Sequence, residues 1–257
     1  MKLSFSTLGC PDWTLEKIAE KGKETGFDGV ELRIEGHQHV DPSLSSKDRL
    51  NIRNLFEKND LEICCLSGYT RFSGLDKMDS KKNEDELCKN IRLAYDLGTP
   101  CVRSFLGGDG NLDDDAADTV RSCCDFASKM DVGILLEIHD SLKTGKQAKN
   151  LLDRLNCDAL HILWDIHHSL AAEELPEDTF AFLKDDIRHV HIKDADANDN
   201  LCLVGDGILP VGDVLHVLKN NRYNGFLSFE WEKMWIPELQ EPEIAFPAYI
   251  SFMKNFR

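Results

Sequence analysis

The chain has 257 residues, a length that suits one α/β barrel but would also allow two smaller domains. Its formal net charge is -16 at pH 7, whereas a nucleic-acid-binding protein normally carries a basic face that neutralises phosphates. We therefore expect a soluble enzyme that acts on small molecules and has no nucleic-acid partner. No membrane association is expected either, because no segment approaches the roughly 20 apolar residues of a membrane span.

The nine cysteines give no sign of a disulfide framework or of a structural zinc site. They include the adjacent pairs Cys64-Cys65 and Cys123-Cys124, and no two have CxxC spacing. An odd number of thiols, several of them in apolar runs, indicates a reducing compartment. The N-terminal segment is too short for a signal peptide and is interrupted by Pro11. We therefore expect a cytoplasmic protein.

Short β-rich runs recur roughly every 30 residues along the chain, as expected for repeated strand–helix units. The predicted strands cover residues 3–7, 29–33, 62–66, 101–105, 132–138, 160–165, 189–193 and 226–231.

The segments between these runs have the spacing of amphipathic helices, as in Leu15, Ile18, Ala19 and Gly22. Asp12 or Thr14 can cap the first helix, and Ser45 or Ser46 the second. Eight such units predict a (β/α)8 TIM barrel that spans residues 1–257 as a single domain. The alternative is an open doubly wound sheet, but no GxGxxG motif follows the first strand.

Function in such barrels collects at the carboxyl ends of the strands, and strands five and six end in polar groups. Glu137 follows a neutral run and shares a face with His139. A buried glutamate needs a partner, which could be a metal ion or a structural cation inside the barrel. Asp165 ends strand six and His168 follows three residues later, so both could reach one metal ion or substrate. The alternative is a capping aspartate beside surface histidines.

Strands seven and eight add further candidate ligands. Alternation places His189, His191 and Lys193 on one face of strand seven. Glu230 and Glu232 share a face of strand eight, so alternation alone does not choose between them.

Together these strands place glutamate, aspartate, histidine and glutamate at four successive strand ends. Carboxylates with one imidazole form a site that suits Mn²⁺ or Mg²⁺ and also accommodates Zn²⁺ or Co²⁺.

At these residues the chain resembles the xylose-isomerase-like barrel superfamily of sugar isomerases and epimerases. The similarity covers nearly the whole chain and rests on the motifs GFDGVEL, LEIH, WDIHH, HVHIKD, GDG and YNGFLSFEWE. It implies that one divalent ion, most readily Mn²⁺, binds to Glu137, Asp165, His191 and Glu230, and thereby selects Glu230 over Glu232.

The resemblance also implies candidate substrate contacts. His168 matches the histidine after the strand-six aspartate, and Glu31 matches the glutamate that ends the second strand. Lys193 is a nearby cation. Apart from the resemblance, apolar walls for a sugar could come from Trp13, Trp164, Trp231 or Trp235, each of which could equally pack in the core or at the rim. The sequence departs from the ketohexose 3-epimerase branch, because no arginine follows His191 in the next several residues. It also lacks the additional histidines of the endonuclease branch.

The resemblance therefore implies a metal-dependent isomerase or epimerase of a small sugar, sugar phosphate or polyol-like ketone. Glu137 and Glu230 would transfer protons through an enediolate. The alternatives are a dehydratase of the inosose or dehydroshikimate type and a non-catalytic sugar-binding barrel. The sequence leaves the oligomeric state open, with a homo-oligomer as one option.

Overall fold

The computed structural model describes residues 1–34 and 39–256, and within them eight parallel strands close into a barrel. The ring is formed, in this order, by β1 (Lys2–Ser6), β2 (Gly29–Arg33), β3 (Glu62–Arg71), β4 (Cys101–Phe105), β5 (Gly133–Glu137), β6 (Leu160–Asp165), β7 (Ile187–Ile192) and β10 (Phe226–Phe229). The predicted (β/α)8 barrel is confirmed. An open sheet is excluded, because each of these eight strands pairs with two neighbours and none is an edge strand.

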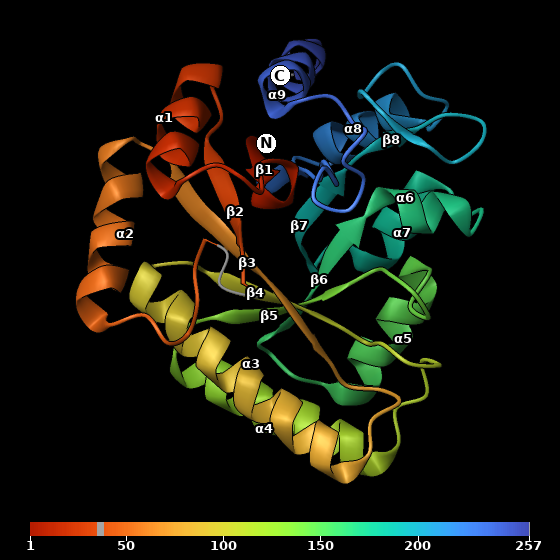
Figure 1. Cartoon of the computed structure of the whole chain (residues 1–257). Helices are drawn as coiled ribbons and strands as arrows, with labels where there is room; N and C mark the ends of the chain where they lie inside the picture. Colours follow the sequence, from red (N-terminus) through yellow and green to blue (C-terminus); the bar gives the residue numbers. More distant parts are fainter. Residues whose placement is uncertain (35–38, 257) are drawn as a thin grey trace.

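Helices surround this ring on its outer side (Figure 1). They are α1 (Leu15–Thr25), α2 (Ser46–Lys58), α3 (Lys77–Leu97), α4 (Asp114–Lys129), α5 (Gly145–Leu155), α6 (Ile166–Ala171), α7 (Pro176–Leu183), α8 (Val211–Asn220) and α9 (Pro242–Met253). A 3-10 turn, η1 (Thr7–Gly9), follows β1. Of the alternative caps, Thr14 accepts a hydrogen bond at the start of α1 and Ser45 at the start of α2.

Three predicted strand boundaries are wrong in ways that matter for the site. β3 continues five residues past Leu66, because the chain stays extended and pairs again with β4 at Arg71. β7 begins at Ile187 and ends at Ile192, so Lys193 follows the strand rather than ending it. β10 ends at Phe229, which places Glu230 directly after the strand.

The apolar core lies mainly between the strands and the helices. Phe5, Phe229 and Phe246 pack together there, and Tyr249 stacks on Phe229 with ring centroids 4.8 Å apart. Burying each such side chain contributes about 1.5–3 kcal/mol. A smaller buried cluster comprises Cys65, Cys101, Leu135 and Leu163 from four adjacent strands. On β4, β5 and β6 these residues precede Arg103, Glu137 and Asp165 by two positions, so they form an apolar layer beneath the charged groups.

The polar segment 194–207 contains a two-stranded antiparallel ribbon formed by β8 (Asp194–Ala195) and β9 (Leu201–Cys202). The Asp194 carboxylate accepts backbone N–H groups from Gly205, Gly207 and Leu209. The segment is therefore anchored to the end of β7. No helix among residues 1–34 and 39–256 is both long and apolar enough to cross a bilayer.

Candidate metal centre and active site

Four buried side chains meet at the carboxyl ends of adjacent strands. Glu137 ends β5 and Asp165 ends β6, whereas His191 lies near the end of β7 and Glu230 follows β10. Each offers an oxygen or nitrogen atom, and these atoms all lie within 4.8 Å of one another. Strand pairing explains the convergence, because Asp165 is opposite His191 and the backbone N–H of Glu230 bonds to the carbonyl of Ile192.

The atoms of this group fit a divalent cation. Nδ1 of His191 is 3.3 Å from Oε1 of Glu137 and 3.3 Å from Oε1 of Glu230. This nitrogen is buried and makes no hydrogen bond within the part of the chain that is described, and Oδ2 of Asp165 is ion-paired with Lys193. Buried polar atoms normally have partners. Three carboxylates and one imidazole that face a common point therefore match the ligand set of a hard or borderline divalent ion.

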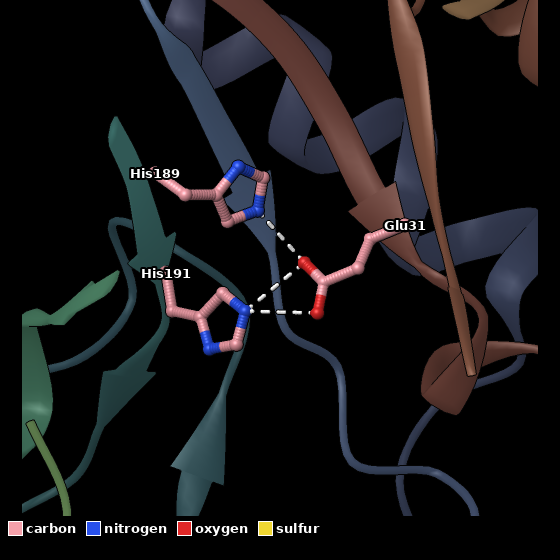
Figure 2. A group of neighbouring side chains, drawn as sticks. All are labelled: Glu31, His189 and His191. Carbon is pink, nitrogen blue, oxygen red and sulfur yellow. Dashed lines mark hydrogen bonds and ion pairs between the residues drawn. The ribbon is translucent and has the colours of Figure 1, made fainter. Parts of the chain in front are cut away.

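The orientation of His191 on β7 is set by Glu31 on β2, and these two strands are separated in the ring by β1 and β10. Nε2 of His191 lies 3.0 and 3.1 Å from the two oxygens of Glu31, and Nε2 of His189 lies 2.8 Å from one of them. Figure 2 shows both rings directed from β7 toward Glu31 on β2, with the other nitrogen of His191 pointing away. A proton on Nε2 leaves the lone pair of Nδ1 for a metal ion.

Glu31 is fully buried, and the hydroxyl of Ser67 also donates to it. Burial raises the pKa of Glu31, but His191 and His189 outweigh that effect and hold its pKa well below the usual value. The sequence suggested that Glu31 contacts substrate. The structure places it behind His191 instead, so its position favours a role in orienting that histidine.

Two buried cations lie among the carboxylates. Nζ of Lys193 is 2.9 Å from Oδ2 of Asp165 and also contacts Glu230. Nη1 of Arg103 is 3.1 Å from Oε2 of Glu137 and 3.4 Å from Oε1 of Glu230. Such pairing offsets the cost of burying ionised groups. The sequence reasoning missed Arg103, although a charged residue inside a buried strand was the available signal.

The charges in this group shift one another's protonation. Burial lowers the pKa of Lys193, but Asp165, Glu230 and Glu232 outweigh it and hold that pKa well above the usual value. Burial raises the pKa of Glu230, but His191, Lys193 and Arg103 together hold it well below the usual value. Glu230 is therefore ionised and Lys193 is protonated near neutral pH.

A cavity of about 440 Å³ opens above these groups. It is lined by Glu137, Glu230, Lys193 and Arg103 together with Leu8, Tyr69, Arg71, Phe105, Gly107, His139, Asp140, Glu232 and Trp235. The aromatic walls and the charged base suit a small polar molecule.

Of the two other predicted substrate contacts, His168 lies beside the candidate metal ligands, whereas Trp13 does not. Nε2 of His168 is 3.8 Å from Oδ2 of Asp165, and its ring lies 4.2 Å from that of His139. Trp13 is buried away from the cavity, where its ring edge packs on Phe246. Of the four candidate tryptophans, Trp235 is the one that lines the cavity.

A family model for xylose isomerase-like TIM barrels matches residues 19–255. The chain belongs to this family. It is 22% identical to the fructoselysine 3-epimerase of Escherichia coli O157:H7, with 93% of each protein covered. It is 25% identical to the hydroxypyruvate isomerase of Escherichia coli K12, over 93% of this chain and 92% of that protein.

Solved structures of similar proteins share the barrel. A probable 3-dehydroshikimate dehydratase from Bacillus anthracis superposes with a TM-score of 0.80, 19% identity and full coverage of both chains. At this identity the likeness establishes the fold alone.

Proposed function

We propose that this protein is a divalent-metal-dependent isomerase or epimerase of a small sugar, sugar phosphate or polyol-like ketone. The observation that carries the proposal is the convergence of four ligand-type side chains within 4.8 Å at the base of a cavity. The relatives named as an epimerase and an isomerase support it.

Glu137, Asp165, His191 and Glu230 would hold the ion. Mn²⁺ is the expected ion because it accepts both carboxylate and imidazole ligands, and Mg²⁺, Co²⁺ or Zn²⁺ are alternatives. When bound, the ion would act as a Lewis acid that stabilises negative charge developing on substrate oxygen atoms.

Glu137 and Glu230 are the proposed proton-transfer groups, because they are the two members of this set that also line the cavity. One carboxylate would remove the proton next to the carbonyl group and the other would return a proton to the enediolate. Arg103 contacts both carboxylates, and its positive charge helps to hold the pKa of Glu230 below the usual value. Proton transfer by a positioned carboxylate typically contributes about 10²- to 10⁴-fold to the rate.

The remaining groups would bind and orient the substrate. Lys193 lines the cavity beside Glu230, and its ammonium group would give up one of its three carboxylate contacts to donate a hydrogen bond to a substrate oxygen. His168 lies near the base of the site, and Trp235 forms part of the wall. Glu31 would act through His191, and Trp13 would support the site through core packing.

One observation favours a dehydratase as the second candidate. Lys193 is a protonated acid that contacts Glu230 and lies 2.9 Å from Glu232. An acid beside the proposed base could protonate a hydroxyl group as it leaves from an enediolate. The similarity to the 3-dehydroshikimate dehydratase of Bacillus anthracis, which is 26% identical over 72% of this chain, is consistent with this chemistry.

The test combines metal analysis with solvent exchange. Protein purified without chelator should contain about one divalent ion per chain. A panel of ketoses, ketose phosphates and short hydroxy-ketones in deuterated water should include a compound whose carbon-bound hydrogen exchanges. A product that absorbs in the ultraviolet would identify the dehydratase. Absence of metal, with no exchange after Mn²⁺ is added, would contradict both candidates.

A further inference from the structure

The cavity has an arginine at its mouth that the proposed proton transfer does not use. Arg71 is the last residue of β3, is paired in register with Phe105 of β4, and lines the cavity. Its side chain is exposed, unlike that of Arg103, which is buried at the base. The two arginines therefore face the same cavity at different depths.

The local backbone is shaped to accommodate Arg71. Gly107 has a φ of +73°, and a Cβ atom there would lie 2.8 Å from Cβ and 3.1 Å from Cδ of Arg71. The stem of the arginine thus lies against bare backbone, where a larger residue at 107 would displace it. The Gly107 carbonyl accepts a hydrogen bond from Ser141, and the backbone N–H of Arg71 donates to Asn83.

Among the described residues, the ion pairs around the cavity do not involve the guanidinium group of Arg71, so this group could bind a ligand. The three arginine and lysine side chains that line it are Arg71, Arg103 and Lys193. Arg103 and Lys193 are paired with carboxylates at the base, and Lys193 also pairs with Glu232 at the rim. The other rim carboxylate, Asp140, lies 2.9 Å from Nδ1 of His139. Within residues 1–34 and 39–256, no carboxylate lies within ion-pair distance of the Arg71 guanidinium.

We propose that Arg71 binds an anionic group on the substrate, a carboxylate or a phosphate, while the reacting hydroxy-ketone lies at the base. A guanidinium binds either group through two parallel hydrogen bonds. The proposal rests on the proposed function for the position of the reacting group. It names the substrate class as a hydroxy-ketone with an anionic end.

Three compounds with a common hydroxy-ketone head test this proposal. Dihydroxyacetone is neutral, hydroxypyruvate carries a carboxylate, and dihydroxyacetone phosphate carries a phosphate. Each would be titrated calorimetrically into Mn²⁺-loaded protein, which reports binding without requiring turnover. The variant is Arg71→Gln, and Arg222→Gln is a control with the same charge change at an exposed turn before β10, at the opposite end of the barrel.

We expect at least one anionic compound to bind about tenfold or more tightly than dihydroxyacetone, since charge-assisted hydrogen bonds are involved. The preferred anion distinguishes carboxylate from phosphate. Arg71→Gln should remove the preference and leave dihydroxyacetone affinity within about twofold of wild type, whereas Arg222→Gln should retain the preference. A preference that survives Arg71→Gln, or equal binding of all three compounds, would overturn the proposal.

Solvent exchange separates this result from the proposed function. If dihydroxyacetone exchanges its carbon-bound hydrogen but neither anion is preferred, the anion site is wrong and the proton-transfer proposal stands. If Arg71-dependent anion binding is found without exchange in any of the three compounds, the anion site stands and the proton-transfer proposal is contradicted.

Discussion

Nε2 of His191 lies 3.0 Å from a carboxylate oxygen of Glu31, and this contact determines which ring nitrogen faces the candidate metal site. Both residues are completely buried, and they come from β7 and β2. Together with the contact between His189 and Glu31, this contact connects β7 with β2. Outer carboxylates of this kind fix the tautomer and orientation of a ligating histidine.

The first prediction is that Glu31→Gln weakens Mn²⁺ binding about 10- to 100-fold, because the amide removes the charge that holds the Nε2 proton of His191. Titration calorimetry with Mn²⁺ would measure the change. Glu62→Gln is a matched control, since Glu62 is exposed and pairs with Lys2 at the start of β3. Unchanged affinity in Glu31→Gln would show that Glu31 does not position the ligand.

The second prediction is that a chelator lowers the melting temperature and that Mn²⁺ restores it. An ion present at 100 times its Kd stabilises the native state by about 2.7 kcal/mol, which corresponds to a shift of about 5–10 °C for a chain of this size. Differential scanning calorimetry would measure the shift. Asp165→Ala should lack the Mn²⁺-dependent part of the shift, and a full Mn²⁺ response in that variant would argue against the site.

The third prediction concerns the nine cysteines, all of which are free in the structure. Burial raises the pKa of Cys10 and Cys64 well above the usual value, and raises that of Cys202 to about 11. A raised pKa leaves less thiolate at a given pH, so the native protein should react slowly with a thiol reagent at pH 8.

Denaturation should release all nine thiols to the same reagent without prior reduction. This outcome would support the cytoplasmic location expected from the sequence, because thiols stay reduced there. A reproducible shortfall of two thiols in freshly purified protein would indicate a disulfide and count against that location.

The site residues at the strand ends could be predicted from the sequence, because side-chain alternation along each strand and the barrel fold together determine where they lie. Glu137 and Asp165 each end a buried run, and the barrel brings such ends to one face. The resemblance then chose Glu230 over Glu232, which alternation left equivalent. The structure explains the difference between these two glutamates, because β10 stops at Phe229 and Glu232 lies nearer the rim beside Lys193.

The residues of the cavity wall were harder to predict from the sequence, because they depend on how far β3 extends. The residues after Leu66 include Ser67 and Gly68, which resemble a turn, yet the strand continues and carries Tyr69 and Arg71 to the cavity. That extension depends on pairing with β4, which periodicity in one segment does not reveal. Trp13 shows the same limit, since its burial depends on contact with the distant helix α9.

The two glutamates after β10 differ in burial and in position within the cavity, so variants of the two can be compared directly. Glu230 is buried among His191, Lys193 and Arg103. Glu232 is partly exposed, lines the cavity, and pairs with Lys193 at 2.9 Å. The same substitution at both positions removes one charge beside the same lysine, so a difference between the variants isolates the position of the carboxylate.

The last prediction is that Glu230→Gln lowers solvent exchange into substrate by about 10²- to 10⁴-fold while much of the metal is retained. The amide oxygen can still coordinate an ion but cannot accept the proton. Glu232→Gln should retain all the metal and lower exchange by less than about tenfold, because its loss changes only the surroundings of Lys193. Metal analysis and deuterium incorporation would be measured on the same preparations. Near wild-type exchange in Glu230→Gln, beside a large loss in Glu232→Gln, would assign the base to Glu232. Normal exchange in both variants would place the base elsewhere and remove the two-carboxylate mechanism.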